Sequence, residues 1–474
     1  MARSSWLLCA AGLLASCSLT RPDVSDCSSN SECRASFGPG SVCGGDGLCQ
    51  MAPENPRCSE THPADLLTRP EDHPNALIFG SLEDRSVVTQ EARENAVRLA
   101  ARQVNDEGGL DGRELGVVFC NIAEDPKVDS ATRSEAAVAS AQYLSGVMGV
   151  PAIIGPSAST DTLAVFQALS GSGTLLISPA ATSPALTGID VAKATDDAPG
   201  LLWRTAPPDT VQGAAIARFL NEQTPPVTSV WVIHETGIYG EALTGVFLPE
   251  LQANGGTGTV REFSTQTELD SAVNEAAGSS AEWVLFISSQ TSDAAAFLNG
   301  AAALSGFDAK NVFLTDAAAN TDLLNATQSA TSIYPRVRGT KPGLPSGNVY
   351  EQFRASFNAA YSAEANDYTF VAHAYDAAWL SFLGAAWAKK NASISGLGIA
   401  KGLRHVVATG TAVPLLPTSF PKLTEALESN ESVNLTGASG TLDYDPDTEE
   451  TTGPVDIWQI SGNQISVIKT DPGI

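Results

Sequence analysis

Two turns rich in small hydroxyl residues lie close together in the chain, Gly-Pro-Ser-Ala-Ser-Thr from Gly155 and Ser-Pro-Ala-Ala-Thr-Ser from Ser178. Hydroxyl groups such as those of Ser159 and Thr182, together with free backbone N–H groups at a helix N-terminus, bind anions such as a carboxylate. The alternative is that both residues only cap helices. Two such turns in succession favour a binding site.

Short apolar runs precede both turns and predict the strands that would position them. Pro151–Ile154 and Thr174–Ile177 are rich in apolar residues and too short for helices, so each is expected to be a buried strand. Between them, Asp161–Leu169 is expected to form a short helix. The carboxyl ends of parallel strands meet at one edge of an open α/β sheet, and such sheets bind ligands there.

The same alternation of strand and helix extends along most of the chain. Before the two turns we expect strands at Ala76–Phe79 and Leu115–Phe119 and helices at Val88–Val104 and Ser134–Leu144. After Pro207-Pro208, a second series of strands is expected at Ser229–Ile233, Trp283–Ile287 and Val312–Leu314. Strands that alternate with helices indicate doubly wound parallel sheets, so the fold class is α/β.

Composition limits the classes of partner and activity. The 474 residues suffice for two or three domains. The net charge of −26 argues against a nucleic-acid partner, since phosphate backbones demand a basic surface. The five histidines are scattered, and the chain has no zinc-type pair, G-x-S-x-G elbow or P-loop. An enzyme, a metal and a cofactor are therefore not expected, although a hydrolase whose base comes from elsewhere in the fold stays open.

The first 17 residues are typical of an export signal. Arg3 precedes an apolar stretch over residues 6–15, and the Leu-Ala-Ser-Cys sequence that ends at Cys17 follows the bacterial lipobox pattern. We expect lipid on Cys17 to anchor the protein on the periplasmic side of the cell envelope, and Ser18 favours the outer membrane. The alternative is an ordinary signal peptide with an incidental cysteine.

Six further cysteines indicate disulfides, because an even number in an exported chain is typical of oxidised pairs. Four of them follow a C-x5-C-x9-C-x5-C pattern in a segment too small to fold without covalent links, namely Cys27, Cys33, Cys43 and Cys49. A zinc site is the alternative, but the spacing lacks close C-x2-C pairs. We expect these four to pair among themselves and Cys58 to pair with Cys120, which ends a strand next to the first one.

The residues of the two turns also carry a family resemblance. Gly155–Ser159 has the pattern Gly-Pro-x-x-Ser and Ile177–Thr182 is Ile-Ser-Pro-Ala-Ala-Thr. Both resemble the first lobe of type I periplasmic binding proteins of the Leu/Ile/Val (branched-chain amino acid) class. Further matches follow in the family's order, at Asn105–Gly112, Leu202–Gly213, Tyr239-Gly240 and Tyr375–Ala377. The resemblance covers the chain from about Ala76 to its end.

The resemblance implies two α/β lobes joined by hinge crossings. The first lobe would contain residues 76–206 and 334–440, and the second residues 207–333 and 441–474. The crossings are expected near Thr205–Asp209, Tyr334–Gly343 and Gly437–Leu442. Before the lobes, the sequence predicts a signal peptide over residues 1–17, a Cys-rich module over 18–58 and a linker over 59–75.

The resemblance also implies a ligand site in the cleft between the lobes. The residues implied for the ligand's carboxylate, through hydroxyl and backbone N–H groups, are Ser159, Thr160, Ala180 and Thr182. Tyr239 and Asp316 would complete the site from the second lobe, with Asp316 paired to a cationic amine. Thr89 and Gln290 depart from the pattern, since they stand where related amino acid binders often carry aromatic residues.

The expected function is that of an extracytoplasmic lipoprotein that binds a small solute, an amino acid or related compound, and delivers it to an ABC importer. The alternative is a ligand-sensing receptor of the cell envelope, with the same cleft but no transport role. The Cys-rich module is unusual for a plain transport receptor and favours this alternative somewhat.

Overall fold

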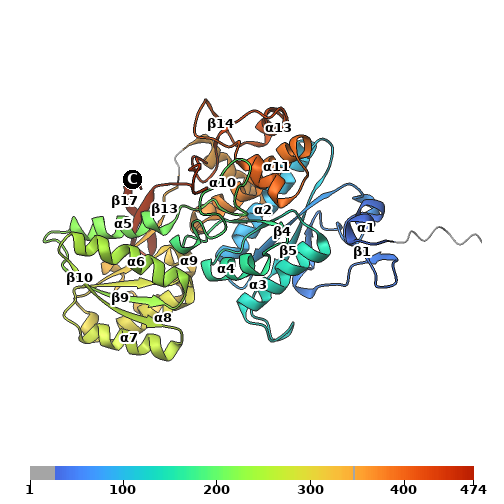
Figure 1. Ribbon diagram of the computed structural model, residues 1–474. Coiled ribbons are helices and arrows are strands. Elements are labelled where there is room, and N and C mark those ends of the chain that lie inside the picture. The colour runs from blue at the N-terminus through green and yellow to red at the C-terminus, as the bar shows by residue number, and fades with distance from the viewer. Residues whose placement is uncertain (1–26, 345–346, 474) are drawn as a thin grey trace, which may run out of the picture.

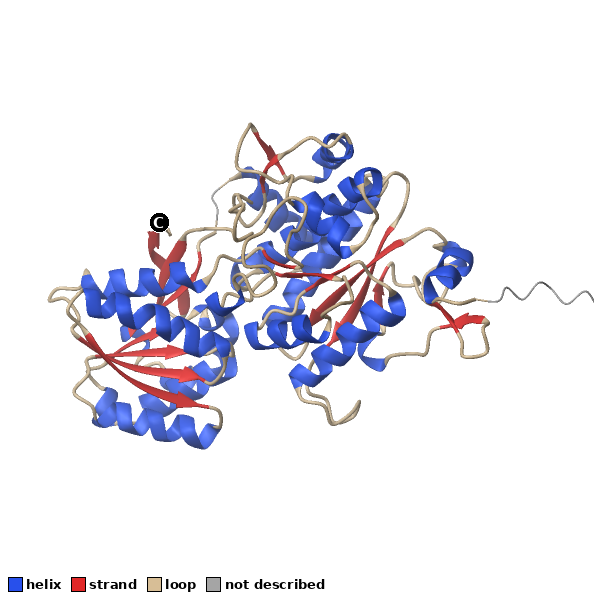
Figure 2. Cartoon of the chain, in the orientation of Figure 1, coloured by secondary structure: helices blue, strands red, loops and turns tan. Residues whose placement is uncertain are grey.

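The computed structural model describes residues 27–344 and 347–473. Two α/β lobes lie side by side, and a small module flanks the first lobe at the N-terminal end of the described chain (Figures 1 and 2). The predicted α/β class is confirmed, with mostly parallel sheets. The predicted signal peptide and Cys17 lie outside the described ranges. Within those ranges, no helix is long and apolar enough to cross a membrane.

The first lobe is built on a six-stranded sheet in the order β3-β5-β4-β6-β7-β8. Its strands are β3 (Glu60–His62), β4 (Leu77–Glu83), β5 (Leu115–Asn121), β6 (Ala152–Ile154), β7 (Leu175–Ser178) and β8 (Leu202–Arg204). All neighbours are parallel except β3, which runs antiparallel to β5. Successive residues of β4 point to opposite faces, Phe79 into one hydrophobic cluster and Ile78 into another, so both faces of the sheet are covered.

Helices cover this sheet on its two faces. They are α2 (Val88–Asp106), α3 (Arg133–Gln142), α4 (Ser159–Ala168), α10 (Asn348–Tyr361), α11 (Val371–Asn391), α12 (Gly396–Leu403) and α13 (Phe420–Glu428). Every residue of α11 from Val371 to Ala388 is buried, because the helix packs against α2, α12 and α13. A short parallel pair, β14 (Ala412–Pro414) and β15 (Asn434–Thr436), lies beside them.

The second lobe is built on a seven-stranded sheet in the order β10-β9-β11-β12-β13-β16-β17. Its strands are β9 (Ser229–Glu235), β10 (Thr257–Phe263), β11 (Trp283–Ile287), β12 (Asn311–Leu314), β13 (Val337–Pro342), β16 (Val455–Ser461) and β17 (Gln464–Asp471). Its helices are α5 (Asp209–Asn221), α6 (Ile238–Ala253), α7 (Gln266–Gly278), α8 (Thr291–Ala302) and α9 (Thr321–Ala326). β16 and β17 run antiparallel to their neighbours, and the other strands are parallel.

Two predicted lobe boundaries differ from the positions at which the chain changes lobe. β13, expected in the first lobe because that lobe was to resume at residue 334, pairs with β12 and β16 in the second sheet. Leu442 and Tyr444, expected in the second lobe, pack in a hydrophobic cluster of the first. One crossing follows β13 and another precedes β16. The two lie side by side, since the Gly343 N–H donates to the Pro454 carbonyl at 2.7 Å. The family resemblance suggested earlier crossings, whereas strand pairing and packing between distant segments decide where each lobe ends.

Residues 59–75, predicted to be a linker, are part of the first lobe. β3 pairs with β5, and Leu66 is buried against Gly116, where a Cβ would lie 2.7 Å from the leucine side chain. The His73 ring lies 3.0 Å from an Asp65 carboxylate oxygen and 2.5 Å from one of Glu114. Pro and charged residues suggested a linker, but contacts with a strand far away in the sequence bury this segment.

Among the described residues, three disulfides hold the N-terminal part of the chain, in the predicted pairing. Cys27–Cys43 and Cys33–Cys49 close the module, which consists of α1 (Asn30–Phe37) and the antiparallel strands β1 (Ser41–Cys43) and β2 (Cys49–Met51). Because these four sulfurs are bonded in pairs, they offer no thiolate to a zinc ion.

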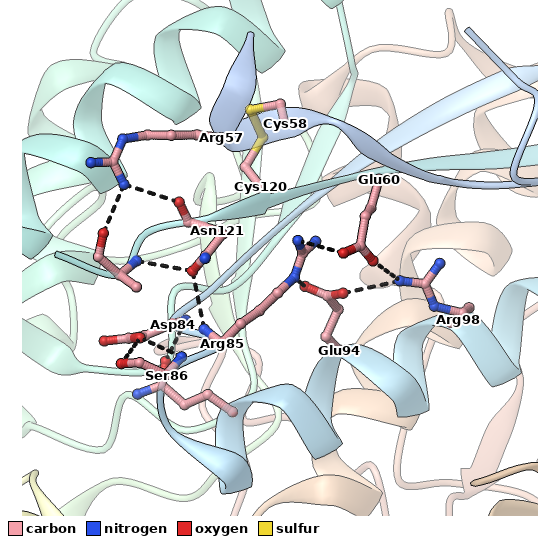
Figure 3. Close-up of polar contacts among 12 residues, drawn as sticks. Arg57, Cys58, Glu60, Asp84, Arg85, Ser86, Glu94, Arg98, Cys120 and Asn121 are labelled. Carbon is pink, nitrogen blue, oxygen red and sulfur yellow. Dashed lines mark hydrogen bonds and ion pairs between the residues drawn. A yellow bond between two sulfur atoms is a disulfide. The ribbon is translucent and has the colours of Figure 1, made fainter. Parts of the chain in front are cut away.

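The third disulfide, Cys58–Cys120, joins the exit of the module to β5. Next to it, the Arg57 guanidinium donates to the carbonyls of Asn121 and Ala123 at 3.2 and 2.8 Å (Figure 3). The disulfide and these hydrogen bonds fix the module's exit against the end of a central strand, so the N-terminal segment is built into the first lobe.

Candidate functional site

A cavity lies between the two lobes, at the carboxyl ends of the central strands. Five of the six predicted ligand-binding residues line it, namely Ser159, Ala180 and Thr182 from the first lobe and Tyr239 and Asp316 from the second. The volume open to the centres of water-sized molecules is about 40 Å³, whereas one water needs roughly 10–15 Å³. The space is therefore small.

Ser159 lies at the start of α4 but does not cap it. The N-cap residue is Ala158, and no side-chain capping bond is made. Instead, the Ser159 Oγ accepts a hydrogen bond from the Ser183 N–H at 3.2 Å. The capping alternative is thus wrong for Ser159, and its hydroxyl proton stays available for an acceptor in the cavity. The N-terminus of α4 adds a positive dipole end at this place, which favours an anion.

Thr182 follows β7 and connects the two lobes. Its Oγ1 donates to Asp209 Oδ2 at 2.8 Å, and the Asp209 N–H donates back to the Thr182 carbonyl at 2.8 Å. Thr182 therefore caps no helix of its own segment either. Since Asp209 begins α5, this double contact fixes the first residue of the second lobe against the rim of the first.

Asp316 follows β12 and is 6% exposed. The Tyr239 hydroxyl donates to its Oδ1 at 2.6 Å. Burial raises the pKa of Asp316, against the lowering effects of Tyr239 and the charge of Arg93. Burial and the nearby charge of Asp316 likewise raise the pKa of Asp209. The charge of Asp316 makes ionisation of Asp209 less favourable, so a cation bound beside these two buried carboxyl groups would be stabilised, and an ammonium group has that charge.

Thr160 does not line the cavity, contrary to the prediction. It is exposed and lies at the rim where the lobes meet, since a Cβ at Gly237 would be 3.1 Å from its Oγ1. Successive helix residues point about 100° apart. Once Ser159 at the start of α4 faces the cavity, Thr160 must point away from it.

The cavity has further wall residues that the sequence did not single out. They are Gln90, Arg93, Ser157, Ala158, Ser289, Ala317 and Phe370. Gln90 follows Thr89 in the sequence, and Ser289 precedes Gln290. Thr89 and Gln290 are the two positions at which the chain departs from the family pattern. The sequence did contain a signal for Gln90 and Arg93. Both are polar and lie three residues apart, so they share the face of a helix that begins beside the strand ends.

Comparison with known proteins identifies the family. A family model described as "Periplasmic binding protein" matches residues 85–463. The chain belongs to this periplasmic binding protein family. The resemblance to type I proteins of the Leu/Ile/Val-binding kind is thereby confirmed. The family implies an extracytoplasmic or periplasmic location.

The individual relatives share only a modest sequence identity with this periplasmic binding protein. The substrate-binding protein BasB of a chemotactic signal transduction system in Halobacterium salinarum is 23% identical over 76% of this chain and 80% of its own length. The Leu/Ile/Val-binding protein of Escherichia coli is 31% identical, but the match covers only 30% of this chain and 34% of that protein. These relatives are solute-binding proteins.

Solved structures show the same fold over nearly their whole length. A leucine-binding protein, LivK of Thermotoga maritima, has a TM-score of 0.65 at 16% identity and covers 84% of this chain and 99% of its own. LivJ of Streptococcus pneumoniae, solved with isoleucine, has a TM-score of 0.63 at 18% identity, with the same coverage. The parts of the periplasmic binding protein fold are therefore all present, and the disulfide-bonded module precedes the matched region.

The lobes of this periplasmic binding protein touch each other beside the cavity. The Ser183 hydroxyl, on the first lobe, donates to the Ile238 carbonyl at the start of α6 at 2.6 Å. Helix α4 of the first lobe also lies against α6 of the second. These contacts lie next to the cavity wall, so separation of the lobes at this edge would open the cavity.

Proposed function

We propose that the protein binds a small amino acid or a related zwitterion between its lobes and delivers it to an ABC importer. One observation carries the proposal: groups suited to a carboxylate and groups suited to an ammonium face one cavity from opposite lobes. The first set comprises the Ser159 hydroxyl and the backbone N–H groups of Ala180 and Thr182, beside the N-terminus of α4, because the Thr182 hydroxyl already donates to Asp209. The second comprises Tyr239 and Asp316.

The proposed mechanism is hinge closure. The two lobes would separate at the Ser183–Ile238 contact, admit the ligand and close again by rotation about the three crossings. Because each lobe carries half of the site, a ligand with both charges would make more contacts in the closed state than in the open state. It would therefore stabilise the closed state. No step of this mechanism requires a catalytic group, in keeping with the solute-binding role of the relatives.

The test is calorimetry of the ligand that a thermal-shift screen of a metabolite panel identifies. Charge-assisted hydrogen bonds contribute about 1.5–3 kcal/mol each, so Asp316→Ala should weaken an α-amino acid roughly ten- to a hundredfold. A carboxylate without the amine should lose much less. Asp308→Ala, at an exposed position, is the control and should bind like the wild type.

Two results would contradict this site. If Asp316→Ala binds an amino acid as tightly as the wild type, Asp316 does not hold the amine. If Ser159→Ala has no effect either, the ligand binds elsewhere. Turnover of the ligand would instead favour the hydrolase alternative.

A sensing role is the second candidate function, and the similarity to BasB supports it. That relative belongs to a chemotactic signal transduction system, and the N-terminal module offers a surface that the match to the family model does not include. Genes for a permease and an ATPase beside the gene for this protein would favour transport. A receptor gene in that place would favour sensing.

We also infer that lipid on Cys17 anchors the protein, with a preference for the outer membrane. Cys17→Ser should move the protein from the membrane fraction to the soluble periplasmic fraction, since lipid is the anchor that the sequence offers. Fractionation followed by immunoblotting measures this, with Ser18→Ala as the control that keeps the lipidated residue. A Cys17→Ser protein that stays with the membrane would rule out the lipobox interpretation.

A further inference from the structure

A buried arginine lies at one end of the cavity. Arg93, on α2, lines the cavity and is only 7% exposed. Its guanidinium carries five N–H donors. Two of its nitrogens are occupied by Thr369, since Nε donates to the Thr369 carbonyl at 3.0 Å and Nη2 to the Thr369 Oγ1 at 3.3 Å. Within residues 27–344 and 347–473, Nη1 makes no hydrogen bond, and no carboxylate lies within 4.0 Å of the guanidinium.

The surroundings of Arg93 hold its side chain in place. The Phe370 ring lies under the guanidinium, 5.3 Å from its central carbon to the ring centroid, and lines the same cavity. Phe370 has a φ of 64°, a left-handed conformation that is strained for a bulky residue and is found where the surrounding structure imposes it. One edge and one face of the guanidinium are thus fixed, and its remaining donors are pre-organised.

Two acidic groups act on Arg93 through their charge, Glu83 and Asp316, but within the described residues neither lies close enough to form an ion pair with it. The Glu83 Oε1 accepts a hydrogen bond from Ser157 at 2.8 Å, and burial raises the pKa of Glu83 to about 8, so this carboxyl is mostly uncharged at neutral pH. Asp316 is bound by Tyr239 and belongs to the second lobe. A buried cation without a partner is costly, and a ligand anion in the cavity would remove that cost.

Resting on the proposed function, we propose that Arg93 binds a second anionic group of the ligand, which makes amino acids with an acidic side chain the preferred class. Such a ligand has two carboxylates and one ammonium. One carboxylate meets Ser159, Ala180 and Thr182, the ammonium meets Asp316, and the side-chain carboxylate meets Arg93. A ligand with an apolar side chain would leave the guanidinium buried without a partner. The small volume of the cavity suits a short side chain.

Calorimetry with matched probes tests this assignment. The wild-type protein should bind L-aspartate or L-glutamate roughly ten- to a hundredfold more tightly than the isosteric L-asparagine or L-glutamine, and more tightly than L-leucine. Arg93→Met, which keeps the length of the side chain but not the charge, should lose this preference, and Arg93→Lys should keep part of it. Arg102→Met, at an exposed position of the same helix, is the matched control and should keep the full preference.

The outcomes separate this inference from the proposed function. If L-leucine or the amides bind the wild-type protein as tightly as the acidic amino acids do, the role of Arg93 is refuted while amino acid binding stands. A preference for acidic amino acids that survives in a folded Arg93→Met protein refutes it as well. If no α-amino acid binds, both proposals fail. If glutarate, which lacks the amine, binds as tightly as L-glutamate, Arg93 keeps its role and Asp316 loses the one proposed for it.

Discussion

Removing the Cys58–Cys120 disulfide should lower the free energy of unfolding of the first lobe by about 4 kcal/mol. The two cysteines are 62 residues apart, and the chain-entropy model for a closed loop of that length gives about this value. The closed loop contains β3, β4 and α2, so the bond restricts the unfolded chain over a large part of the lobe. Chemical denaturation of Cys58→Ala/Cys120→Ala under oxidising conditions measures the loss.

The matched control is Cys27→Ala/Cys43→Ala, which opens a loop of only 16 residues inside the module. This variant should loosen the module and leave hydrogen exchange in β5 unchanged, whereas loss of Cys58–Cys120 should accelerate it. Pairing of β3 with β5 and the Arg57 hydrogen bonds remain in both variants. An unchanged unfolding midpoint without Cys58–Cys120 would mean that these contacts already restrict the chain and that the bond adds nothing.

The order of strands and helices was predictable because its signals are local. The apolar runs at 151–154 and 174–177 form β6 and β7, and their buried parallel pairing follows from the short β-branched pattern. The segment 59–75 was not predictable, because its burial depends on β5 and on Gly116. The same holds for β13, whose sheet is decided by β12 and β16. Amino-acid composition does not indicate contacts of this kind between segments that are far apart in the sequence.

The site was predictable where strand ends bring its residues together. Ser159 and Thr182 lie in the turns after β6 and β7, so sheet geometry places them at one rim, whereas Ala180, Tyr239 and Asp316 were expected from the family resemblance. Arg93 and Phe370 were both missed. Arg93 had a signal, since it shares a helix face with Gln90 beside the strand ends, but the apolar pattern of that helix favoured packing. Phe370 reaches the cavity through a backbone conformation that no sequence pattern indicates.

Glu83 should make the protein less stable as the pH rises from about 4 to about 8. Its side chain is 2% exposed, and one carboxyl oxygen, Oε2, has no hydrogen-bond partner within the described residues. Burial is the main cause that raises its pKa to about 8, whereas the pKa of an unfolded glutamate is about 4.3. Between these two values the folded protein holds a proton that the unfolded chain has lost. Stability therefore decreases with rising pH in this window.

Glu83→Gln removes the ionisable group and keeps an acceptor for the Ser157 hydroxyl, so it should resemble the protonated carboxyl. Near pH 4 the variant and the wild type should unfold at similar denaturant concentrations. At pH 8 to 9 the variant should be more stable, by an amount on the order of several kcal/mol that corresponds to the pKa difference. Other buried carboxyls act on both proteins alike, so the difference between the two isolates Glu83. Glu282→Gln, at an exposed position, should follow the wild type throughout. A stability difference between Glu83→Gln and the wild type that does not change from pH 5 to pH 9 would show that Glu83 is ionised in the folded protein, and Arg93 would then have a partner of its own.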